Sequence, residues 1–134
     1  MNRVGLAVVF LATCAYADSN SATGSWSWHE ANHAGGWLKT IQSGTTIRFQ
    51  LELSRGAPSY NMGWVEGEFA LSGSEGTFHS DAFGTCELHF SFKNKQVVVE
   101  EVADQCGYGY GVTAAGTYQL DSASRPVFSK DGPR

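Results

Sequence analysis

The sequence has little that would form a helix, and its longest apolar run is short. Residues 4–12 form this run, well below the ~20 apolar residues that a membrane-spanning helix needs. The chain has 16 glycines in its 134 residues, together with many aromatic residues and short alternating runs. These features argue against helical and membrane-anchored architectures and favour an all-β domain.

Catalytic motifs are also scarce. The chain has no G-x-S-x-G nucleophile elbow, no phosphate-binding loop and no C-x-x-C pair. Glu66 and Glu68 are two residues apart, so they would share the solvent-facing side of a strand. We interpret them as surface residues and predict no catalytic residue, no cofactor and no metal site.

One motif does match a catalytic pattern. His29-Glu30-Ala31-Asn32-His33 fits H-E-x-x-H, the zinc-protease signature, which requires a helix to bring both histidines to one face. Alternating Ser and Trp precede it and a double glycine follows it, which indicates a strand end and a turn. A zinc metalloprotease is therefore kept only as a remote alternative.

The N-terminus has the three parts of a signal peptide. Arg3 is followed by the apolar run, and Ala15-Tyr16-Ala17 forms a small-x-small cleavage site before a polar stretch. We predict a signal peptide at residues 1–17 and a periplasmic or secreted protein. Lipidation at Cys14 is an alternative, because residues 11–14 resemble a lipobox.

Cleavage would change both the charge and the cysteine content. It would remove Arg3 and none of the 13 acidic residues, so the net charge would change from −4 to −5. This charge argues against nucleic acid or an anionic membrane as the partner and would attract a basic protein. Cleavage would also leave Cys86 and Cys106 as the only cysteines, and we predict that they form a disulfide.

Eight segments have strand character. The clearest is 46–53, where Ile47, Phe49, Leu51 and Leu53 alternate with polar residues. The others are 25–28, 36–42, 64–71, 76–83, 87–93, 96–102 and 116–120. Short links with turn residues join most of them, which predicts a single small antiparallel up-and-down barrel of about eight strands over residues 18–120. A two-sheet β-sandwich is the alternative. The polar tail, residues 121–134, is expected to fray.

Two longer connections and one tryptophan supply the candidate binding residues. The segment 54–63 contains Arg55, Tyr60 and Asn61, and loops on a rigid β scaffold commonly carry recognition. The second connection, 103–115, contains Tyr108 and Tyr110, which either plug the barrel or present a contact surface. Trp37 either fills the core or lines a ligand cavity, as in a lipocalin-like barrel.

Most of the chain after residue 17 resembles a group of uncharacterised bacterial exported proteins. The runs that carry this resemblance are 32–38, 48–53, 55–61, 66–68, 106–109 and 116–118. Some members of that group occur beside or fused to lysozyme-inhibitor domains of the LprI type. The resemblance implies bacterial export and a β fold. This chain departs from it at Gly111 and Ala115, where the group would have Asn and Asp.

Together these features predict an exported, non-enzymatic binding protein. The leading hypothesis is recognition of another protein, with inhibition of a basic cell-wall hydrolase such as lysozyme as its specific form. A small-ligand carrier of lipocalin-like type is the alternative. We expect no nucleic-acid partner and no membrane association after signal cleavage.

Overall fold

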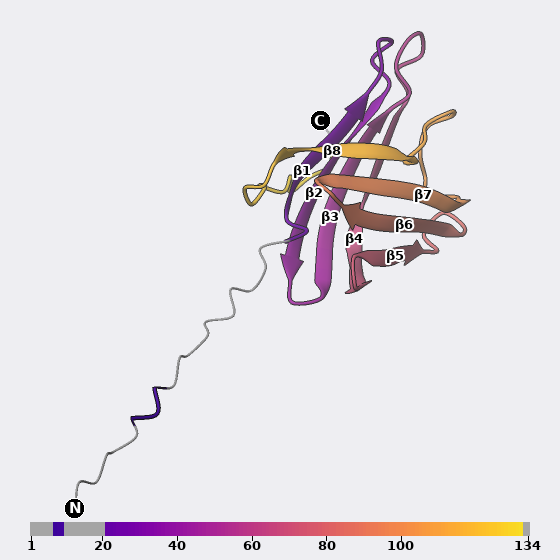
Figure 1. Ribbon diagram of the computed structural model, residues 1–134. Coiled ribbons are helices and arrows are strands. Elements are labelled where there is room, and N and C mark those ends of the chain that lie inside the picture. The colour runs from indigo at the N-terminus through magenta and orange to yellow at the C-terminus, as the bar shows by residue number, and fades with distance from the viewer. Residues whose placement is uncertain (1–6, 10–20, 133–134) are drawn as a thin grey trace, which may run out of the picture.

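A computed structural model describes residues 7–9 and 21–132 (Figure 1). Most of the predicted signal peptide, including Cys14, lies outside the described residues. The strands are β1 (Gly24–His29), β2 (Gly35–Ser43), β3 (Thr46–Ser54), β4 (Met62–Ser72), β5 (Glu75–Ser80), β6 (Cys86–Lys93), β7 (Gln96–Asp104) and β8 (Gly116–Ser122). The described part of the chain forms no helix that could cross a membrane.

The eight strands form a closed antiparallel barrel. Each strand pairs with its neighbour in the chain, and β8 returns to pair with β1. The predicted up-and-down barrel is therefore confirmed. Strands β1 to β4 run steeply in Figure 1 whereas β5 to β8 cross them almost horizontally, so the barrel consists of two layers at a large angle.

Alternation in the sequence places the core. Phe49 and Leu51 of β3 are fully buried, as the period-two pattern predicts. The ring of Phe49 packs against those of Phe69, Phe78 and Phe90, with centroids 5.0 to 5.8 Å apart. These side chains fill the barrel interior, as is usual for a small barrel. This packing gives the small-ligand carrier no support.

A disulfide joins Cys86 to Cys106, as predicted, with the two Cα atoms 4.8 Å apart. It ties the start of β6 to the loop that follows β7. Such a bond is compatible with an oxidising, exported location.

The C-terminal tail does not fray, so that prediction is wrong for the residues up to Ser129. The Gln50 side chain accepts a hydrogen bond from the Ser129 amide at 2.8 Å and donates one to the Ser129 carbonyl at 2.7 Å. Lys39 Nζ donates to the Val127 carbonyl, and the Arg48 guanidinium lies 5.3 Å from the centre of the Phe128 ring. These contacts hold the tail against the outer face of β2 and β3.

Candidate functional site

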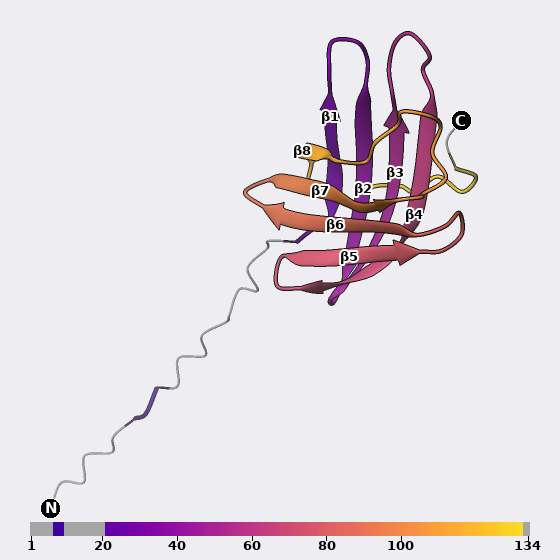
Figure 2. The same cartoon turned by 90° about the vertical axis from the view of Figure 1, so that its right-hand side faces the viewer.

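Three connections lie together at one end of the barrel, which we call the loop end. They are the β1–β2 turn (30–34), the β3–β4 loop (55–61) and the β7–β8 loop (105–115). Figure 2 shows the first two side by side at the tips of two long, parallel hairpins. Backbone and side-chain hydrogen bonds join all three.

The β3–β4 loop is attached to the β1–β2 turn at Gly56. The next residue, Ala57, donates its amide to the Asn32 carbonyl at 2.8 Å. Gly56 has a φ of +77°, and a Cβ atom there would lie 2.5 Å from the same carbonyl oxygen. Only glycine accepts this backbone conformation and this close approach together.

The β7–β8 loop is attached to the other side of the β3–β4 loop. Asn61 Nδ2 donates to the Tyr110 carbonyl at 2.8 Å, and the Gly109 amide donates to the Met62 carbonyl at 2.9 Å. The Arg55 guanidinium lies 5.5 Å from the centre of the Tyr110 ring, in cation–π range. The sequence-predicted residues Arg55 and Asn61 therefore meet at one residue of the second long loop.

The exposed side chains at this end include Arg55, Tyr60, Met62 and Tyr110, together with polar ones of the β1–β2 turn such as Asn32 and His33. Tyr60 is 52% exposed and Tyr110 is 84% exposed. Tyr60 also has a φ of +51°, a rare conformation for an aromatic residue, while its amide donates to the Gly56 carbonyl at 2.9 Å. An exposed set of Tyr, Met and Arg has the composition typical of a protein-binding surface.

Tyr108 packs into the barrel end, which settles its two alternatives in favour of the plug. Its ring covers Gly63, packs against the hydrophobic core, and carries a buried hydroxyl without a hydrogen-bond partner among the described residues. Burial raises the pKa of this hydroxyl well above its usual range. Tyr110, two residues later, takes the exposed position.

Trp37 lies on the outer face of β2 rather than in the core or in a cavity. It is 44% exposed and is paired with Ser27 of β1 and Glu52 of β3. Trp26, by contrast, is buried and donates its ring N–H to Thr40 Oγ1 at 2.9 Å. The two tryptophans therefore occupy opposite faces of the same sheet.

Two side chains support the β7–β8 loop from below. The Tyr118 hydroxyl donates to the Ala114 carbonyl at 2.8 Å, and a carboxylate oxygen of Glu101 accepts the Ala114 amide. Tyr118 is fully buried, and burial raises its pKa well above the usual range. The sequence did not predict this support, because Glu101 interrupts the apolar alternation of β7 and belongs to no recognisable motif.

The H-E-x-x-H residues lie in a hairpin turn, not in a helix. His29 ends β1, the Glu30 amide donates to the Ala34 carbonyl at 2.8 Å, and the His33 amide donates to the Glu30 carbonyl at 3.0 Å. Residues 7–9 and 21–132 contain no group of three His, Cys, Asp or Glu placed to hold a metal ion. The geometry thus gives the zinc-protease alternative no support.

Comparisons with protein-family models, curated proteins and solved structures give no match.

Proposed function

We propose that this chain is an exported, non-enzymatic binding protein and that its loop end recognises another protein. The observation that carries the proposal is the joining of three loops by hydrogen bonds, with Arg55 and Tyr110 in contact and Tyr60 and Met62 exposed at the same end. Arginine and tyrosine are enriched among the residues that dominate binding energy in protein interfaces.

The loop end is organised before any partner binds. Hydrogen bonds from Ala57, Asn61 and Gly109 fix the three loops relative to one another. Loops that are already ordered lose little conformational entropy on association. This favours a surface that docks as a rigid body over one that folds on contact.

The partner class we propose is a basic cell-wall hydrolase such as lysozyme. The charge of −5 expected after signal cleavage would speed association with a basic enzyme. Glycosidase clefts contain a pair of carboxylates, and the planar guanidinium of Arg55 would bind one of them through two hydrogen bonds. The resemblance to exported proteins found beside lysozyme-inhibitor domains points to the same class.

A turbidity assay tests this proposal. The exported protein, with its disulfide intact, is added in molar excess to a basic lysozyme acting on bacterial cell walls at low salt. We expect slower clearing and a complex on gel filtration. Arg55→Ala and Tyr110→Ala should each weaken inhibition about tenfold or more, because each removes a central contact.

Lys93→Ala is the matched control, because it removes one exposed cation from a β6–β7 hairpin strand instead of from the loop end. It should inhibit like the unchanged protein. Absence of both inhibition and complex formation at excess protein would contradict the proposed partner.

A further inference from the structure

The weakest seam of the barrel lies between β4 and β5. Only two residue pairs join these strands, Leu71 with Gly76 and Ser72 with Glu75, whereas nine pairs join β3 to β4 and six join β5 to β6. Beyond these pairs the strands diverge, with β4 running steeply and β5 crossing horizontally in Figure 1. The middle of β4, residues 64–68, therefore has one edge that no described strand pairs with.

Hydrogen bonds at the two ends of β4 show which backbone groups face the seam. The Leu71 amide donates to Thr45, on the β3 side, and the Met62 carbonyl accepts from Gly109, on the opposite side. Because backbone groups alternate along a strand, those of Trp64, Glu66 and Glu68 point into the seam. No described strand pairs with them there.

The edge of β5 that faces β4 also has backbone groups without a strand partner. The Ser74 carbonyl accepts the Phe92 amide on the β6 side, so the backbone groups of Thr77 and His79 point toward β4. The register gives neither residue a partner on β4 among the described residues. The seam is thus bordered by two facing edges that are each ready to pair.

A cleft of about 210 Å³ opens in this seam. Trp64 and Glu66 line one side, Ser80 and Phe83 line the other, and Phe78 and the disulfide form its floor. Phe83 is 72% exposed, although its ring packs over Gly107. Phe83 therefore adds apolar surface to the rim of the cleft.

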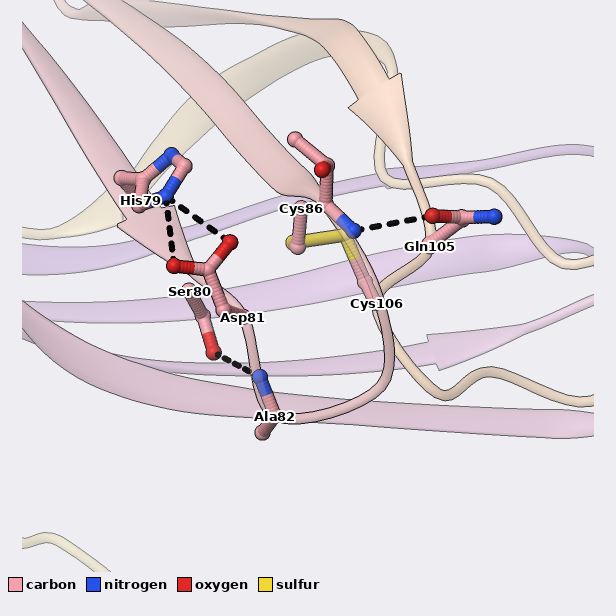
Figure 3. Close-up of polar contacts among 8 residues, drawn as sticks. His79, Ser80, Asp81, Ala82, Cys86, Gln105 and Cys106 are labelled. Carbon is pink, nitrogen blue, oxygen red and sulfur yellow. Dashed lines mark hydrogen bonds and ion pairs between the residues drawn. A yellow bond between two sulfur atoms is a disulfide. The ribbon is translucent and has the colours of Figure 1, made fainter.

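The far wall of the cleft is held in place by its own contacts (Figure 3). Gln105 Oε1 accepts the Thr85 amide at 2.9 Å, and the disulfide fixes Cys86 to Cys106. Ser80 Oγ accepts the Ala82 amide at 3.3 Å. These contacts fix the far wall of the cleft relative to the disulfide.

The surroundings of the cleft are acidic. Glu66 and Glu68 are exposed on β4, and Asp81 and Glu87 lie on the β5–β6 side. No lysine or arginine is among the described residues that line the cleft. Arg48 lies 3.8 Å from Glu68, and His79 Nε2 lies 3.1 Å from a carboxylate oxygen of Asp81, so Glu66 and Glu87 are the two of these acidic residues that have no ion pair among the described residues.

We propose that this seam binds an extended, basic peptide segment of a partner protein as an additional strand between β4 and β5. Main-chain hydrogen bonds to Trp64, Glu66 and Glu68 would hold the segment, as in other cases of strand addition. One apolar side chain of the segment would enter the cleft between Trp64 and Phe83, and its basic residues would face the acidic rim. The site is separate from the loop end and does not depend on the function proposed for it.

Fluorescence anisotropy with a labelled nine-residue peptide of alternating lysine and valine tests the proposal on the full exported chain. We expect saturable binding that weakens as salt is added. A peptide of alternating glutamate and valine should bind at least tenfold more weakly. Amide hydrogen exchange should slow at Trp64, Glu66 and Glu68 when the lysine peptide is present.

Two variants separate the contribution of main-chain pairing to peptide binding from that of the acidic side chains. Glu66→Pro removes an amide that faces the seam and leaves the hydrogen bonds to β3 intact, so the barrel should fold and lose peptide binding. Glu66→Gln with Glu68→Gln should weaken binding about tenfold, whereas Glu100→Gln, an exposed change on β7, should not. If Glu66→Pro does not fold, the amide-exchange pattern still tests the site.

Three results would overturn the proposal. They are no saturable binding of the lysine peptide, equal binding of the glutamate peptide, and protection of the seam amides by self-association of the protein alone. The last would show that a second copy of this chain occupies the edge. None of these results bears on lysozyme inhibition, so the two proposals can fail separately.

Discussion

At the scale of single residues, the loop end depends on positions that tolerate one amino acid. Gly56 combines a left-handed backbone with a contact to the neighbouring turn. Gly44 also has a positive φ, of 61°, but nothing lies within 4 Å of the place where its Cβ would be. A side chain at Gly44 would therefore meet backbone strain alone, whereas a side chain at Gly56 would meet backbone strain and steric overlap.

Gly56→Ala should destabilise the protein more than Gly44→Ala does. The backbone cost, about 1 kcal/mol, applies to both variants, and Gly56→Ala adds a clash that forces the two hairpin tips apart. We expect an additional loss of about 1–3 kcal/mol, measured by urea unfolding. Equal losses in the two variants would show that the contact between the hairpins contributes nothing.

Tyr118 couples stability to alkaline pH. Its burial raises the pKa of the hydroxyl in the folded state above the value near 10 of an unfolded chain. The folded protein therefore keeps its proton at a pH where the unfolded chain loses it. The resulting stability is fully present below about pH 10 and is lost as the pH rises above it.

Tyr118→Phe should reduce this alkaline loss and cost about 1–2 kcal/mol at pH 7, because the hydrogen bond to Ala114 disappears. Unfolding by urea at pH 7 and pH 10.5 measures both effects. Tyr60→Phe is the control, because Tyr60 is exposed. Removing its hydroxyl should change neither the stability at pH 7 nor the loss of stability at pH 10.5. A Tyr118→Phe protein with an unchanged alkaline slope would contradict the assignment, although Tyr108 is expected to retain part of that slope.

At the scale of elements, the tail behaves as part of the barrel wall. Its contacts bury Gln50 to 4% exposure, although this residue stands at an outward position of β3. Deleting residues 127–134 would remove the two hydrogen bonds between Gln50 and Ser129 and the contact of Arg48 with Phe128, leaving Gln50 bonded to Glu66 and Arg48 beside Glu68.

We expect this deletion to cost about 1–2 kcal/mol, the value of one or two hydrogen bonds, and to speed amide exchange in β2 and β3. Deletion of residues 133–134 alone should change neither quantity, because the contacts described above end at Ser129. Unchanged unfolding after the longer deletion would mean that the tail adds nothing to stability.

Elements also show where strand patterns in the sequence fail. The predicted strand 76–83 ends at Ser80, because Asp81 pairs with His79 at 3.1 Å and the chain turns toward the disulfide. The strand predicted for 96–102 instead continues to Asp104, past a register shift between Glu87 and Leu88 on its partner. Such ends depend on contacts with distant residues that periodicity does not report.

At the scale of the whole molecule, the disulfide connects the two candidate surfaces, the loop end and the cleft in the β4–β5 seam. Cys106 belongs to the β7–β8 loop, and both cysteines line the cleft. The disulfide closes a segment with a sequence separation of 20 residues. A double Cys86→Ala and Cys106→Ala variant should lose roughly 3 kcal/mol on the loop-entropy relation, measured by urea unfolding. A reduced wild-type protein should match the variant, and an oxidised protein no more stable than the variant would contradict this role.

The barrel could be predicted because alternation is a local property of the sequence, and the disulfide because only two cysteines follow residue 17. Arg55 and Asn61 could be selected because they lie in a long loop with few structural demands. Three features could not be predicted, because each depends on how separate strands are aligned. They are the contact of Gly56 with Asn32, the exposure of Tyr110 and the cleft beside Trp64. The tail was misjudged for the same reason: its partner, Gln50, precedes Ser129 by 79 positions.

The position of the chain's C-terminal end has a practical consequence for any experiment on this protein. A Cβ atom at Gly132 would lie 3.9 Å from the indole of Trp64, which borders the cleft in the seam. An affinity tag or fluorescent fusion joined directly after Gly132 would therefore begin beside that cleft and obstruct it. Labels for interaction screens belong on the N-terminal side of β1.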